Sequence, residues 1–135
     1  MNPLAAVPET HVHAPTDVPF DPEVVANDLE DSSAEEALRW ALETFHPKLY
    51  IACSFQKTNS VLIDMAFKIN PGTRFFYLDT DVLFEETYAT RDAFAERYGI
   101  GFERYHNISI EEQATQFGDE LWNRDPDACC GIRKV

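Results

Sequence analysis

Two adjacent cysteines followed by two basic residues are the feature of this sequence best suited to chemistry. Cys129 and Cys130 stand in the stretch DACCGIRKV, just before Arg133 and Lys134. Neighbouring cysteines are poorly placed to form a disulfide with each other, because the preferred bridge needs more widely separated Cα atoms. Two thiolates from one turn can instead bind one metal centre, whose negative charge the cations would offset. Since a cubane cluster needs four thiolates, either the missing ligands lie elsewhere or the pair is incidental.

A polar turn after a short apolar run is the second candidate site. The stretch CSFQKTNSVL reads as a strand, a loop and a helix, with Ser54, Lys57 and Asn59 in the turn. Backbone N–H groups at a helix start, together with hydroxyls and a lysine, can hold a phosphate or a sulfate. The glycines of a Walker loop are absent, and taken alone the turn is more typical of a plain βα connection. Cys53 is expected to be a small buried core residue.

Acidic and hydroxyl side chains follow the second apolar run, in the stretch YLDTD. Asp79, Thr80 and Asp81 could hold Mg²⁺ or accept hydrogen bonds from ribose hydroxyls, or they could cap the next helix. The residue pattern leaves these alternatives open. His46 and His106 each stand alone at an element boundary without a partner acid at catalytic spacing, and both are expected to be structural.

The order of the predicted elements indicates how these stretches are brought together. Strands alternate with helices, which predicts an α/β fold with a parallel sheet and helices on both faces. In such sheets ligands bind at the carboxyl ends of the strands, where both polar stretches fall. The expected strands are 48–54, 73–80 and 101–107, and the expected helices are 21–30, 32–45, 60–69, 85–98, 109–118 and one that opens at Asp125 or Asp127.

Length and composition limit the class of protein. With 135 residues the chain suits one domain, expected over residues 21–135, after a flexible proline-rich tail over residues 1–20. A net charge of −13 disfavours binding to nucleic acid. Three cysteines argue for metal, redox or catalytic use rather than a disulfide scaffold. No apolar run is long enough to span a membrane and no signal peptide precedes the domain, so we expect a cytoplasmic protein.

The chain resembles the N-terminal part of assimilatory adenylyl-sulfate (APS) reductases, in the APS/PAPS reductase family, over about residues 20–135. The matching stretches are SFQKTNSVLIDM, RFFYLDTDVLFEETYATRDAFAERYG and LWNRDPDACCGIRKV. The Cys-Cys-x-x-Arg-Lys end is the specific part, whereas the other two stretches are shared with PAPS reductases. The resemblance implies an adenine-nucleotide α-hydrolase-like sheet, related to the PP-loop ATP pyrophosphatases.

The resemblance also implies roles for particular residues. Cys129 and Cys130 would supply two of the four ligands of a [4Fe-4S] cluster, and Lys134 would link that cluster electrostatically to the substrate. The loop from Ser54 to Asn59 would hold the phosphosulfate, and the Leu-Asp-Thr stretch would lie beside the adenosine. The implied substrate-binding residues are Ser54, Phe55, Gln56, Lys57, Leu78, Asp79 and Thr80.

The implied reaction is the thioredoxin-dependent reduction of adenylyl sulfate to sulfite and AMP, in sulfate assimilation and cysteine biosynthesis. Thioredoxin or glutaredoxin would be the partner, and a homo-oligomer is conceivable. In the family the nucleophile belongs to a C-terminal Glu-Cys-Gly-x-His segment, and the other two cluster ligands belong to a downstream Cys-x-x-Cys. This sequence contains neither segment. We therefore expect a fragment that is inactive alone; the alternatives are a PAPS reductase or an inactive remnant that binds adenine nucleotides.

One position departs from the family pattern within the matching stretches. Asp81 stands where Leu-Asp-Thr is usually followed by glycine. If that position requires a positive φ, aspartate can adopt it at some energetic cost. A carboxylate there would also repel an anionic substrate if it faced the site.

Overall fold

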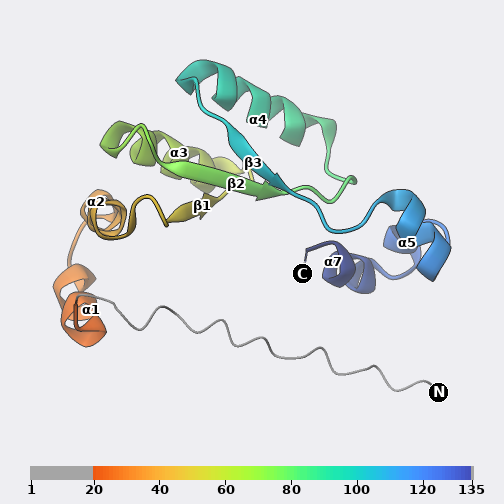
Figure 1. The fold of residues 1–135 in the computed structure, drawn as a ribbon, viewed down its shortest axis with the longest axis horizontal. Coiled ribbons are helices and arrows are strands. Elements are labelled where there is room, and N and C mark those ends of the chain that lie inside the picture. The colour runs from red at the N-terminus through yellow and green to blue at the C-terminus, as the bar shows by residue number, and fades with distance from the viewer. Residues whose placement is uncertain (1–19, 135) are drawn as a thin grey trace. The chain divides into compact units, whose positions relative to one another are not determined.

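The computed structural model describes residues 20–134 and contains a three-stranded parallel sheet (Figure 1). The strands β1 (Tyr50–Ala52), β2 (Arg74–Leu78) and β3 (Phe102–Tyr105) lie in the order β1-β2-β3. Both neighbouring pairs are parallel, which confirms the predicted α/β fold with a parallel sheet. The predicted tail lies outside the described residues except for Phe20.

Helices connect the strands and follow the last of them. The chain divides after Ser33 into two compact units, and α1 (Pro22–Glu30) belongs to the first. Among the described residues, no helix is long and apolar enough to cross a membrane. The helices of the second unit are α2 (Ala34–Phe45), α3 (Lys57–Ile69), α4 (Glu85–Tyr98), α5 (Ile110–Phe117), α6 (Leu121–Arg124) and α7 (Pro126–Lys134).

The ends of several helices follow from local hydrogen bonds. The predicted capping box at α5 is present: the Ser109 hydroxyl accepts from the Glu112 N–H at 3.1 Å, and the Glu112 carboxylate accepts from the Ser109 N–H at 2.9 Å. Gly99 ends α4 at φ +64°, which a residue without Cβ adopts easily. The carboxylate of Asp125 accepts from the Ala128 N–H at 3.0 Å, so Asp125 rather than Asp127 caps α7.

The structure corrects several of the predicted elements. Helix α3 begins at Lys57, three residues before the predicted start at Ser60, because the polar residues of the turn form its first helical turn. Helix α6 was not predicted, since four residues are too few to show a helical period. The strands are also shorter than predicted, so the loops that follow them begin earlier.

The buried core lies on one face of the sheet. The register aligns Ile51, Phe75 and Phe102 across the three strands. Residues of α2, α3 and α4 belong to this core or pack against it, as expected for right-handed crossovers in the order β1-β2-β3. The opposite face carries Tyr50 and Phe76, which are half-buried. The helix residues in or against this core are Leu38, Leu42, Leu62, Ile63, Ala66, Ile69 and Phe94.

Candidate functional site at the carboxyl ends of the strands

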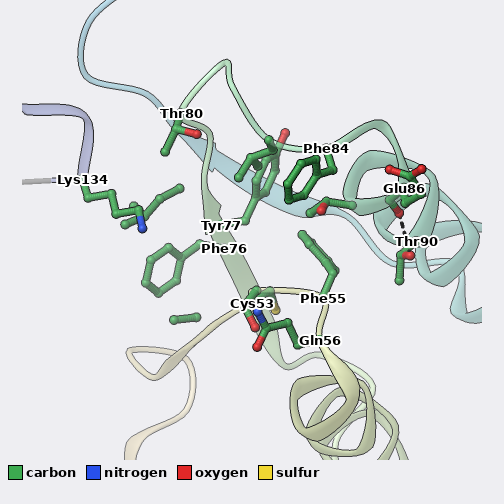
Figure 2. A pocket seen from close by; sticks show the side chains of 15 residues that line it. Cys53, Phe55, Gln56, Phe76, Tyr77, Thr80, Phe84, Glu86, Thr90 and Lys134 are labelled. Atoms are coloured by element: carbon green, nitrogen blue, oxygen red, sulfur yellow. Dashed lines mark hydrogen bonds between the residues drawn. The ribbon is translucent and has the colours of Figure 1, made fainter. Parts of the chain in front are cut away.

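A cavity of about 670 Å³ opens where β1 and β2 end, as expected for a parallel sheet. Figure 2 shows Lys134 on one side of this pocket and Phe55 and Phe84 on the other, with residues of β2 between them. Helix α7 therefore contributes to the same site as the loops after the two strands. The predicted site residues that line the pocket are Ser54, Phe55, Gln56, Leu78, Thr80 and Lys134.

Asn59 determines the shape of the loop between β1 and α3. Its Oδ1 accepts hydrogen bonds from the N–H groups of Ser54 at 3.1 Å and Phe55 at 3.0 Å, and its Nδ2 donates to the Ala52 carbonyl at 3.2 Å. Asn59 is buried, so these three bonds are shielded from water. One amide side chain thus replaces the backbone partners that the tight turn lacks.

The same loop holds a strained backbone conformation. Phe55 has φ +60°, which is uncommon for a bulky residue and is found mainly where the surrounding structure enforces it. Its ring packs edge-on against Phe102 at 5.0 Å and against Tyr77 at 5.8 Å between ring centroids. The buried ring and the Asn59 hydrogen bonds together hold this turn beside the pocket.

The first turn of α3 is available to an anion. Gln56 occupies the N-cap position and makes no side-chain capping hydrogen bond. The first N–H groups of a helix have no acceptor within it, and they carry the positive end of the helix dipole. Lys57 is the first helical residue; it is exposed and does not line the pocket. The N–H groups of Ser54 and Phe55, by contrast, are already bonded to Asn59.

The charge of the pocket is balanced among the described residues that line it. Lys134 is their one cation and Glu86 their one carboxylate. Phe84 adds an apolar surface at the mouth and is 79% exposed. The pocket can therefore hold a ligand that combines a flat apolar group with an anion.

Asp79 anchors the loop after β2 through three hydrogen bonds. Its Oδ1 accepts from the Tyr88 hydroxyl at 2.6 Å and from the Asp81 N–H at 3.0 Å, and its Oδ2 accepts from Arg104 Nε at 2.7 Å. Burial favours the protonated acid, but these three donors outweigh it and lower the pKa of Asp79. Burial and the adjacent Asp79 carboxylate together raise the pKa of Tyr88 to about 12. Asp79 is thus a structural anchor that does not itself line the pocket.

Asp81 does adopt the positive φ that its place in the motif suggested, with φ +59°. Its carboxylate contacts Arg104 Nη2 at 3.1 Å and His106 Nε2 at 2.5 Å, and it does not line the pocket. His106 has no acid at catalytic spacing in the sequence, but folding brings it to the carboxylate of a residue 25 positions earlier. Nothing in the spacing of Tyr88 and Arg104 signalled that they would complete this cluster.

The three cysteines lie in different surroundings. Cys53 is buried as predicted. Burial raises the pKa of its thiol to about 11, although a hydrogen bond with Asn59 acts in the opposite direction. Such a thiol remains protonated at neutral pH and is a poor nucleophile. Cys129 is buried and Cys130 is exposed, on successive positions of α7.

A four-thiolate cluster is not completed by the described residues. Two adjacent thiols of α7 supply half of the donors that such a group needs. No group of three or more histidine, cysteine, aspartate or glutamate side chains that could hold a metal ion occurs within residues 20–134. The described residues therefore do not form a complete four-thiolate site.

Comparison with known proteins places the chain in a family. Residues 48–135 match the phosphoadenosine phosphosulfate reductase domain. The adenosine 5′-phosphosulfate reductase of Salinibacter ruber is 43% identical over 108 residues, which cover 79% of this chain and 43% of that protein. The enzyme of the same name from Geobacillus thermodenitrificans is 41% identical, over 81% of this chain and 47% of its own length.

A solved structure shows the same fold. The phosphoadenylyl-sulfate reductase of Candida auris, determined as a phosphate complex, superimposes with a TM-score of 0.71 at 33% identity. The match covers 84% of this chain and 56% of that one. The chain thus spans less than half the length of the two curated relatives. Its sequence and its fold agree: the chain belongs to the phosphoadenosine phosphosulfate reductase family.

Proposed function

We propose that this chain binds adenylyl sulfate and forms the nucleotide-binding part of an adenylyl-sulfate reductase. The observation that carries the proposal is the pocket itself, which brings Gln56, the N-cap residue of α3, together with Lys134 at the ends of β1 and β2. Both features attract an anion, and both lie in the stretches that match the family. The apolar surface of Leu78 and Phe84 suits the purine.

The proposed reaction reduces adenylyl sulfate to sulfite and AMP. A thiolate attacks the sulfate sulfur, the bond from sulfur to the bridging phosphate oxygen breaks, and AMP leaves with the electron pair. The sulfur then remains on the enzyme as a thiosulfonate, and a dithiol such as thioredoxin or glutaredoxin releases it as sulfite while becoming a disulfide. Lys134 and the first turn of α3 would bind the anionic group and stabilise the charge that develops on it.

The nucleophile of this reaction is not assigned to a residue of the chain. Cys53 is excluded by its buried thiol with a pKa of about 11. We assign Cys129 and Cys130 as two of the four ligands of a [4Fe-4S] cluster, because they are the adjacent thiols of the family-specific Cys-Cys-x-x-Arg-Lys motif. The chain's own contribution is to bind and orient the nucleotide, in a pathway that assimilates sulfate into cysteine.

The charge balance of the pocket favours adenylyl sulfate over its 3′-phosphorylated form. A 3′-phosphate adds about two negative charges, and the described lining residues offer it no further cation beyond Lys134. Glu86 would repel that added charge. The 135-residue chain should therefore bind adenylyl sulfate more tightly than phosphoadenylyl sulfate.

Isothermal titration calorimetry of the 135-residue chain tests this function. Adenylyl sulfate is expected to bind at one site, and Lys134→Met should weaken binding about tenfold or more, because charge-assisted hydrogen bonds contribute about 1.5–3 kcal/mol. Lys68→Met is the matched control, since Lys68 is an exposed lysine of α3 paired with Asp64 outside the pocket. No binding of adenylyl sulfate, or equal losses in the two variants, would contradict the proposal.

A further inference from the structure

Arg133 is buried against the protein, in contrast to its exposed neighbour Lys134. The Arg133 side chain is 1% exposed, and its Nη1 donates to the carbonyls of Thr80 at 2.7 Å and Ile108 at 3.1 Å. Its Nε donates to Oε1 of Gln113 at 2.8 Å. One side chain of α7 thus joins the loop after β2, the loop after β3 and helix α5.

Two further contacts extend this junction. Gln113 is 1% exposed, and its Nε2 lies 3.5 Å from the Cys129 sulfur. The carbonyl of Ile132 accepts from Asn107 Nδ2 at 2.6 Å, which ties the end of α7 to the loop after β3 a second time. The last turn of α7 is therefore fixed on more than one side.

The surroundings of Arg133 are poorly suited to stabilising the fold. A buried guanidinium loses its hydration, and the carboxylate nearest to it, Asp81, lies 3.8 Å away and is itself partly exposed. The Arg133 Nη2 is buried without a hydrogen-bond partner among the described residues. Apolar side chains often replace buried charges without loss of stability, so the arrangement calls for a reason other than stability.

The location of Arg133 beside the pocket suggests a functional reason for its burial. Thr80, whose carbonyl holds Arg133, lines the pocket together with Lys134. Arg133 therefore connects the residue that carries the pocket's ammonium group to the wall of the same pocket. We propose that Arg133 is a positioning residue, which holds Lys134 where its ammonium meets the anionic group of the nucleotide; this rests on the function proposed above.

A double-mutant cycle on adenylyl sulfate affinity tests the proposal. Lys134→Met removes the ammonium group, and in Arg133→Lys the new lysine cannot make the three divergent hydrogen bonds of the guanidinium. Each variant is therefore expected to bind about tenfold more weakly. The double variant should bind within about twofold of Lys134→Met. Arg133 acts through the Lys134 ammonium, so its replacement has little further effect once that ammonium is gone. Losses that multiply in the double variant would overturn the proposal, as would wild-type affinity in a folded Arg133→Lys protein.

Two additional measurements separate this inference from the proposed function and from simple misfolding. Gln113→Leu removes one acceptor of Arg133 from outside α7, and it should show the same lack of additivity with Lys134→Met. In the nucleotide-free chain, Arg133→Lys should speed amide hydrogen exchange of Ile132–Lys134 about tenfold, and more than it speeds the exchange of the core strands. Arg74→Lys, at the far end of β2, is the control and should leave this exchange unchanged. Unchanged exchange in Arg133→Lys would overturn the positioning role whether or not the chain binds nucleotide.

Discussion

Replacing Asn59 with alanine is expected to destroy most of the affinity of this chain for adenylyl sulfate. The variant loses the acceptor that holds the Ser54 and Phe55 N–H groups and the donor to the Ala52 carbonyl. Buried polar groups left without partners cost about 1–3 kcal/mol, and Phe55 would relax from its φ of +60°. Because the loop then no longer presents the start of α3 to the pocket, binding should weaken by about tenfold or more.

A control at a second asparagine separates the effect of Asn59→Ala on the site from its effect on stability. Asn70→Ala is the matched control, because the Asn70 side chain also accepts from a backbone N–H, that of Gly72 at 2.8 Å, but at the opposite end of α3. Both variants should lower the free energy of unfolding in urea, whereas affinity measured by calorimetry should fall in Asn59→Ala alone. Equal affinities in the two variants would show that Asn59 does not shape the binding loop.

Phe75→Ala is expected to have the largest effect on stability. Phe75 lies on the central strand, is 1% exposed and packs against Phe102 with ring centroids 5.7 Å apart. Truncating a buried phenylalanine to alanine typically lowers the free energy of unfolding by about 3–5 kcal/mol, through lost burial and the cavity that remains. This is a large part of the about 5–15 kcal/mol that stabilises an ordinary domain.

Urea denaturation followed by circular dichroism measures this loss directly. Val61→Ala serves as the control, because Val61 is 59% exposed on α3 and its truncation should change stability by less than about 0.5 kcal/mol. If Phe75→Ala unfolds at nearly the urea concentration of the unchanged chain, the central strand is not the core of the fold. A variant that is too unstable to purify agrees with the expected direction.

Periodicity and helix ends made much of the fold predictable. The run RFFYL is apolar enough to indicate a buried strand, and the spacing of Ser109 and Glu112 indicates the start of α5. Alternation of strands and helices then leads to a parallel sheet, whose carboxyl ends gather the polar loops. These signals are local, so they are visible in a single sequence.

The residues that organise the site were harder to predict because their partners are distant in sequence. Arg133 reaches the carbonyl of Thr80 across 53 positions, and Arg104 reaches Asp79 across 25. The sequence suggested Arg133 as a cation near a thiolate-bound metal centre, which stays a prediction, but gave no sign that folding buries it among carbonyl groups. Such contacts depend on how the loops converge after the strands have paired, which no spacing rule describes.

The functional roles were predicted from family resemblance more than from residue chemistry. The turn after β1 could equally have been a plain connection, since it has none of the glycines of a phosphate-binding loop. The structure adds the uncapped start of α3, the strained Phe55 and the approach of Lys134, and these features are the basis on which we propose an anion site. Lys57, the lysine nearest to that turn in sequence, does not line the pocket.

The central claim is that adenylyl sulfate binds at the carboxyl ends of β1 and β2, and backbone amide chemical-shift mapping tests it most directly. On titration of the 15N-labelled chain with adenylyl sulfate, the largest shift changes are expected over residues 54–58, at Leu78 and Thr80, and at Lys134. Amides at the opposite ends of the strands, such as those of Tyr50 and Arg74, should remain nearly unchanged. Shift changes centred at those opposite ends, or none at saturating ligand, would contradict the assignment of this pocket.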